Sequence, residues 1–130
     1  MNIKKENFKL TITHYKILDT IYSLNEKHLY PLHTGVGKIL NGAKDDETLK
    51  YSDLPTYGTL ISYGSKKLSR YIMMLTRYHY LGRKYDPTTN ELYLEITPLG
   101  ISNLLAFRKK HKNPYKKKEV EEEVTIVYIP

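Results

Sequence analysis

The chain has 130 residues, of which 40% are hydrophobic and 27% are charged, a balance typical of one soluble globular domain. It contains no cysteine, which excludes disulfide scaffolds, thiol nucleophiles and cysteine-ligated zinc or iron–sulfur sites. Its formal net charge of +7 favours a polyanionic partner, either nucleic acid or an anionic membrane surface.

The charge and the hydropathy are unevenly distributed along the chain. No apolar run approaches the roughly 20 residues of a membrane span, and no secretory signal follows Met1, so we expect a cytoplasmic protein. Residues 108–118 hold seven basic and no acidic side chains, whereas residues 119–130 hold four acidic and no basic ones. We therefore predict a folded domain over residues 1–107 and a charged, flexible tail over residues 108–130.

The first part of the chain predicts one helix followed by a short extended segment. Residues 1–12 are polar with scattered apolar positions, and we expect an irregular arm there. A helix is predicted from an N-cap at Thr13 to about Asn25, because apolar residues recur at helical spacing. Residues 29–32 are expected to be extended, since Pro31 disfavours helical backbone at the residue before it.

A short second helix and an irregular linker follow. The helix is predicted to have Thr34 as its N-cap and to end at Asn41 and Gly42. Residues 43–64 contain one proline, two glycines and an acidic cluster, so we expect no regular structure. Five apolar side chains of this linker are expected to pack on the core: Leu49, Leu54, Tyr57, Leu60 and Ile61.

The longest helix is predicted over residues 66–81, with Ser65 as its cap. Its buried stripe is expected to consist of Leu68, Ile72, Leu75 and His79. A β-hairpin should follow, with a turn at residues 86–90 and with Leu92, Leu94 and Ile96 on one face of its second strand.

Thr97 and Pro98 predict the cap and first residue of a last helix that continues through Phe107. The resulting order of helices and strands is that of an α+β winged helix-turn-helix, a helix bundle with a two-stranded β-wing.

The long helix and the hairpin carry the candidate site. No acidic residue occurs from Leu54 to Tyr85. Six cations lie in this stretch: Lys66, Lys67, Arg70, Arg77, Arg83 and Lys84. Together with Ser65, Tyr71 and Tyr78, they predict contacts with nucleic acid, because cations bind phosphates and tyrosines offer hydroxyl groups and flat rings. The alternatives are a solvated helix face and tyrosines at the edge of the core.

No catalytic pattern rises above chance. Ile39 follows Lys38 where a phosphate-binding loop requires Ser or Thr. The five histidines lack paired metal-ligand spacing, and the acidic cluster at residues 45–47 is expected to be solvated. We predict no enzymatic activity, no metal site and no cofactor.

Several segments resemble the RQC domain, the winged-helix module at the C-terminal side of RecQ helicases. These segments are Gly37–Lys44, Leu49-Lys50, the loop from Tyr57-Gly58 to Tyr63-Gly64, Ser69–Leu75 with Tyr80–Gly82, and Leu94–Gly100. The resemblance covers roughly residues 14–106. It implies a stand-alone module without the helicase motor or the cysteine zinc module of many relatives.

The resemblance implies binding of duplex or forked DNA through phosphates. The residues it carries over are Thr34, Lys38, Ser65, Lys66, Lys67, Arg70, Arg83, Lys84 and Tyr85. Relatives that separate strands often have an aromatic residue at the wing tip, and residues 86–90 have none. From the resemblance, and because no catalytic pattern is present, we predict a non-enzymatic DNA-binding protein of DNA repair or replication.

Two alternatives remain open at this stage. One is a dimeric winged-helix transcription regulator, although the sequence shows no long dimerisation helix. The other is a protein-interaction module for a helicase or another partner. It would dock through its Tyr-rich surface and through the C-terminal tail, where residues 124–129 are strongly β-prone.

Overall fold

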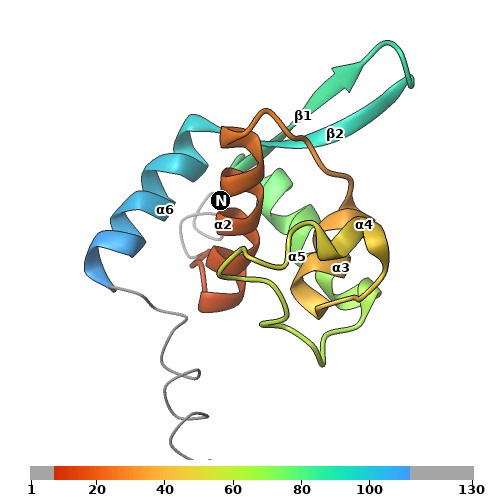
Figure 1. Cartoon of the computed structure of the whole chain (residues 1–130). Coiled ribbons are helices and arrows are strands. Elements are labelled where there is room, and N and C mark those ends of the chain that lie inside the picture. The colour runs from red at the N-terminus through yellow and green to blue at the C-terminus, as the bar shows by residue number, and fades with distance from the viewer. Residues whose placement is uncertain (1–7, 112–130) are drawn as a thin grey trace, which may run out of the picture.

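Helices surround an apolar core and carry a two-stranded hairpin at one end of the molecule (Figure 1). The computed structural model describes residues 8–111. Its elements are α2 Ile12–Glu26, α3 His33–Asn41, α4 Asp46–Leu49, α5 Ser65–Arg77, β1 Leu81–Asp86, β2 Glu91–Ile96 and α6 Pro98–Lys110. This order confirms the predicted α+β winged-helix class.

The core lies around α2, which has α6 on one side and α3 with α5 on the other (Figure 1). Its fully buried side chains come from every long helix and from the base of the hairpin. The buried core residues are Ile17, Leu18, Ile21, Val36, Leu40, Leu60, Leu68, Ile72, Leu75, Leu81, Leu94, Ile96 and Leu104. Most of the apolar side chains that helical and strand periodicity predicted to be buried meet in this cluster, and Leu24, Ile39 and Leu54 form a smaller second one.

The base of the hairpin is tied to the helices by backbone hydrogen bonds. The two strands are antiparallel, with Leu81 opposite Ile96. The predicted extended segment at residues 29–32 lies along β2, because the Leu94 N–H donates to the Pro31 carbonyl at 2.8 Å. The Asn25 side chain at the end of α2 accepts from the Ile96 N–H at 2.8 Å. These contacts fix the direction in which the wing leaves the bundle.

Three predicted helix caps were wrong by one or two residues. The cap of α2 is Thr11, and Thr13 is buried inside the helix, where its hydroxyl hydrogen-bonds to the Tyr63 hydroxyl at 3.0 Å. The cap of α3 is Leu32, so Thr34 lies within the helix, and the cap of α5 is Gly64 rather than Ser65. Neither Leu32 nor Gly64 has a capping side chain, so no sequence signal marks these starts.

The helix α5 is shorter than predicted. It has 13 residues and ends at Arg77, whereas α2 has 15 and is longer. His79 is exposed rather than buried, and it ends the helix in a left-handed conformation with φ of 68°. The Thr97 hydroxyl donates to the His79 carbonyl at 2.7 Å, a contact from distant sequence that holds this turn.

The linker between α3 and α5 is more ordered than predicted. It contains the one-turn helix α4, which Asp45 caps by accepting from the Thr48 N–H at 3.2 Å. Leu54 and Leu60 are buried as predicted, but Leu49 is 42% exposed and Ile61 is 72% exposed. Leu49 is the last residue of the short helix α4, and Ile61 lies in the turn before α5.

The last helix begins with the predicted cap, because the Thr97 hydroxyl accepts from the Gly100 N–H at 3.0 Å. It continues to Lys110, so three residues that we assigned to the tail lie in α6. The rest of the predicted tail, from residue 112, lies outside the described residues. Within the described range, no helix is long and apolar enough to cross a membrane.

Candidate nucleic-acid interface

One side of α5 presents cations to solvent. Leu68, Ile72 and Leu75 face the core. The opposite side exposes Lys66, Arg70, Met73 and Arg77, which recur at i, i+4, i+7 and i+11. The exposed face is therefore rotated by about one residue from the predicted one, which included Tyr71 and Tyr78 and, at the same helical spacing, Met74. These three side chains are only half-exposed.

The two tyrosines of the predicted face pack against the edge of the core. The Tyr71 ring lies 4.9 Å from the His14 ring, in an edge-on arrangement. The Tyr78 ring stacks on Phe8 at 4.2 Å with an angle of 7° between the planes. Their environment matches the alternative that we weighed, tyrosines that close the edge of the core.

The start of α5 combines exposed lysines with free backbone donors. Ser65, Lys66 and Lys67 are exposed, and the first turn contains no acidic residue. The Lys67 Nζ lies 4.4 Å above the Tyr63 ring, a cation–π contact that orients its stem. The positive end of the helix dipole and these ammonium groups together favour an anion.

The wing carries cations on both of its faces. In β1, Arg83 pairs with Leu94 and Tyr85 pairs with Leu92. Both β1 side chains therefore lie on the same face of the hairpin as Leu94, whose side chain belongs to the core. Lys84 pairs with Tyr93 on the other face. All three side chains of β1 are exposed, and the Tyr85 hydroxyl donates to Asn90 Oδ1 at 2.6 Å.

The start of α3 lies close to the wing. Burial and the nearby Arg83 guanidinium both lower the pKa of His33, the first residue of α3. Thr34 is exposed one residue later. The structure therefore brings the Arg83 charge to the end of α3 that bears Thr34.

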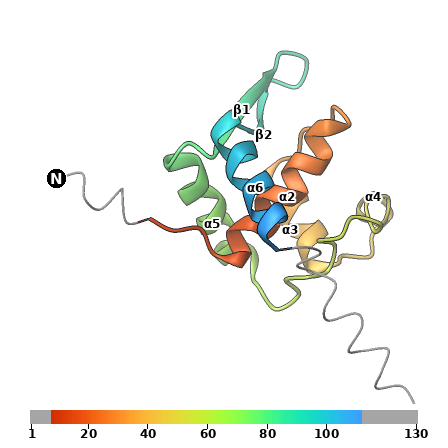
Figure 2. The same cartoon turned by 90° about the vertical axis from the view of Figure 1, so that its left-hand side faces the viewer.

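Lys38 sits in a different electrostatic environment from the cations of α5. Its Nζ lies 4.0 Å from an Asp45 carboxylate oxygen, next to Asp46 and Glu47 at the start of α4. The hydrogen bond from the Thr48 hydroxyl lowers the pKa of Asp45 and keeps it charged. Seen from the side of α6, α4 and α5 lie on opposite sides of the molecule (Figure 2). Lys38 is thus separated from the basic face of α5.

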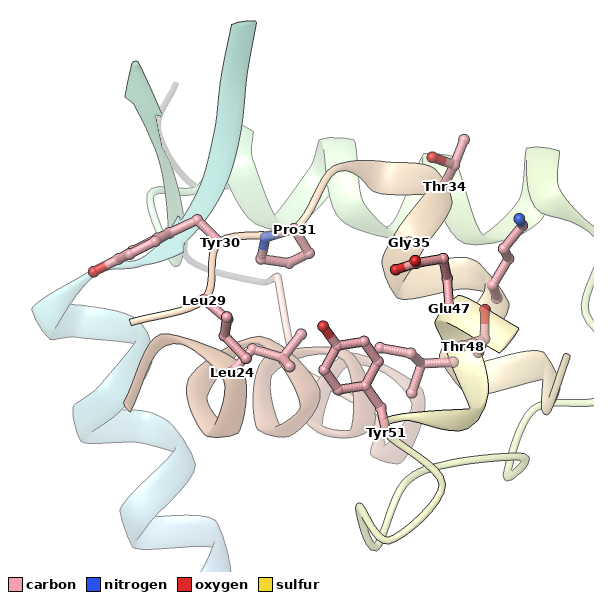
Figure 3. A pocket seen from close by; sticks show the side chains of 11 residues that line it. Leu24, Leu29, Tyr30, Pro31, Thr34, Gly35, Glu47, Thr48 and Tyr51 are labelled. Atoms are coloured by element: carbon pink, nitrogen blue, oxygen red, sulfur yellow. The ribbon is translucent and has the colours of Figure 1, made fainter. Parts of the chain in front are cut away.

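A hollow of about 530 Å³ adjoins Lys38, between the end of α2, the extended segment, α3 and α4 (Figure 3). It is lined by Leu24, Leu29, Tyr30, Pro31, Thr34, Gly35, Lys38, Ile39, Glu47, Thr48 and Tyr51. Tyr30 and Tyr51, like the exposed Met73 of α5, were not among the predicted site residues. The only available signal was aromatic residues between turns, which is too common to identify a site.

The described residues do not assemble a metal-binding cluster. No group of three or more His, Asp or Glu side chains within residues 8–111 could hold a metal ion. His28 and His33 lie on either side of the extended segment, and the acids at 45–47 are exposed.

Comparison with known proteins adds one match. The sequence model of a family described as the RQC domain matches residues 4–122, nearly the whole sequence. No curated protein matches the chain, and no solved structure does.

Proposed function

Because the chain belongs to the RQC domain family, a winged-helix DNA-binding module of RecQ helicases, we propose that it binds duplex or branched DNA without catalysing a reaction. The proposed contacts are mainly with phosphates. They come from the start of α5, from its exposed face and from the wing, with Thr34 at the neighbouring start of α3. DNA repair and replication are the processes in which such a module would act.

One observation carries this proposal. The six cations from Lys66 to Lys84 are all exposed, and no acidic residue interrupts residues 54–85. Within the described part of the chain, none of these six side chains forms an ion pair with a carboxylate. An ordinary solvated surface mixes both signs of charge. The exposed face of α5 carries one sign of charge, which favours the DNA backbone, and the hairpin adds Arg83 and Lys84 beside its own acids Asp86, Glu91 and Glu95.

The proposed mechanism makes a prediction about salt. Each phosphate that a cation neutralises releases counterions, so the logarithm of the binding constant falls by about 0.9 per contact for each tenfold rise in salt. Replacing Lys66→Ala together with Lys67→Ala should weaken duplex binding similarly for all sequences and should reduce this slope by about 2. Fluorescence anisotropy over a salt series, with blunt and forked duplexes and a single strand, measures both effects.

The matched control is Lys109→Ala with Lys110→Ala, an adjacent exposed pair on α6, which lies away from α5 (Figure 1). This control should leave the slope within about 0.5 of the wild-type value. Equal losses for the two pairs would refute the α5 surface as the binding face. A loss confined to one DNA sequence would instead favour base recognition by a dimeric regulator, and light scattering would then reveal a two-fold dimer.

A further inference from the structure

Two hollows of the surface meet at Tyr30. The first is the 530 Å³ hollow of Figure 3. The second measures about 440 Å³ and lies against the wing, where it is lined by Tyr30, Lys84, Tyr85, Asp86, Pro87 and Tyr93. Both volumes fall in the range of small-molecule sites, roughly 300–1,000 Å³. Because Tyr30 lines both, the two hollows adjoin at this residue, and together they make a track that runs from the wing to α4.

The first hollow has an apolar floor and a polar rim. Leu24 and Ile39 are buried beneath it, and Leu29 is partly exposed. Figure 3 shows the Tyr51 ring standing beside Leu29, with its hydroxyl directed toward Pro31. This hydroxyl has no hydrogen-bond partner among the described residues. The hollow therefore offers an apolar floor together with the Tyr51 hydroxyl, which is free to bond to a ligand.

The rim of the first hollow carries groups suited to a nucleotide. Lys38 supplies a cation and Thr34 a hydroxyl group, and both are exposed. The Glu47 carboxylate can accept from the amino groups that adenine, cytosine and guanine carry.

The second hollow pairs a cation with aromatic rings. The Lys84 Nζ lies 5.1 Å from the centre of the Tyr30 ring. Tyr93 stands on the same face of the wing as Lys84, opposite it in the strand pairing. The one carboxylate there, Asp86, accepts from the Thr88 N–H at 2.9 Å, which satisfies part of its charge within the turn.

We infer that this track holds an unpaired strand of DNA, an inference that rests on the proposed DNA-binding function. A phosphate lies at Lys84, a base stacks on Tyr30, and the next base enters the hollow beside Tyr51, with the Thr34 hydroxyl and the Glu47 carboxylate at its rim. Single strands bind proteins through this alternation of cations and aromatic platforms. The bases of a duplex are stacked on one another and cannot enter the hollow, so the track selects the open arm of a fork.

The test compares two tyrosines in like settings. Tyr22 is also half-buried and also lies under a cation, with the Arg108 guanidinium 5.2 Å from its ring. Tyr30→Ala is expected to weaken binding of a forked duplex and of a single strand about tenfold, and of a blunt duplex by less than about twofold. Tyr30→Phe keeps the flat ring and should bind as wild type does. Tyr22→Ala should leave the ratio of fork to blunt duplex affinity unchanged.

A second measurement does not depend on a substitution. A fork with 5-bromodeoxyuridine in its single-stranded arm is irradiated with the wild-type chain, and the cross-linked peptides are identified by mass spectrometry. Attachment within residues 28–38 or at Tyr51 supports the track, whereas attachment only within α5 overturns it. Equal losses for Tyr30→Ala and Tyr22→Ala also overturn it. If the chain binds blunt duplex with a steep salt dependence in these cases, the proposed function survives and only the track is refuted.

Discussion

At the scale of single residues, His14 links the start of α2 to the core. Its Nδ1 lies 2.9 Å from both the backbone nitrogen and the hydroxyl of Thr11, and this histidine stands where a capping box has Glu or Gln. Because the Thr11 N–H donates to Nδ1, this nitrogen must be unprotonated. The ring is buried against Phe8 and Tyr71, and burial lowers its pKa.

This arrangement predicts a loss of stability in mild acid. Above pH 6.5, the ordinary pKa of histidine, His14 is neutral in both the folded and the unfolded chain. Below it, the unfolded chain takes up a proton that the folded chain excludes, so the free energy of unfolding falls until the pH reaches the lowered pKa. His33, whose pKa is also lowered, acts in the same direction. Urea unfolding between pH 8 and pH 5 measures this decline.

The control for this prediction is His14→Gln, which keeps an oxygen that can accept from Thr11 but does not titrate. This variant should show a smaller decline than the wild-type chain, with the remainder due to His33. An unchanged pH dependence would show that His14 does not carry the effect.

Helix ends were predicted correctly where a common capping residue marks them in the sequence. Gly42 ends α3 with φ of 73°, as its position after Asn41 predicted, and Thr97 with Pro98 starts α6. The capping role of Thr11 was missed because its partner at the third helical position is a histidine. Side-chain caps are recognised from sequence only where the usual residue types supply them.

At the scale of elements, periodicity predicted the strands and the helices better than it predicted how they dock. The alternation in Glu91–Ile96 gave the hairpin correctly, although Leu92 is 50% exposed because it lies beyond the core. The hydrogen bond from Ile96 to Asn25 joins residues 71 positions apart. The Tyr78 ring at the end of α5 is covered by Phe8, 70 positions earlier in the chain. Neither contact has a signal within a local window of sequence.

The docking of α6 yields a prediction about Gly100. This buried glycine is the third residue of α6, and an added Cβ would lie 2.7 Å from Ile96 Cγ1 and closer still to the Tyr80 carbonyl oxygen. Gly100→Ala should therefore lower the free energy of unfolding by about 1–3 kcal/mol, because the helix must move away from the turn before β1. Chemical denaturation measures the change.

Gly35 provides the matched control, because it is the third residue of α3 and an added Cβ would meet nothing nearer than Pro31 Cβ at 3.9 Å. Gly35→Ala should raise the free energy of unfolding by about 0.5–1 kcal/mol, since alanine has less freedom to lose in a helix. Equal effects of the two substitutions would contradict the close approach of α6 to Tyr80.

At the scale of the whole molecule, the candidate site was predicted in part. The absence of acids over residues 54–85 is a property of the sequence, and the cations of that stretch are exposed in the fold. The separation of Lys38 from them, and its approach to Asp45, depend on where the linker places α4. The two hollows that meet at Tyr30 depend on the packing of the extended segment against β2. A local window of sequence contains no pattern for such contacts.

The folded unit extends past residue 107, because the last turn of α6 is joined to α2 by an ion pair. The Arg108 guanidinium pairs with Asp19 on α2, whose side chain is only 6% exposed, and it also covers the Tyr22 ring. A chain that ends at residue 107 lacks Arg108, so it loses the ion pair with Asp19 and the last turn of α6. A chain that ends at residue 111 keeps both. The shorter chain should therefore be less stable by about 2 kcal/mol, a value between those of exposed and fully buried ion pairs.

Thermal unfolding of the two truncated chains measures this difference, which corresponds to a fall of about 10 °C in Tm for a domain of this size. Arg108→Ala in the full chain should reproduce most of the fall. The chain that ends at residue 111 should also keep a steep salt dependence of duplex binding, because the six cations from Lys66 to Lys84 remain. If both truncated chains unfold at the same temperature, the domain ends at residue 107 and the pair with Asp19 does not stabilise it.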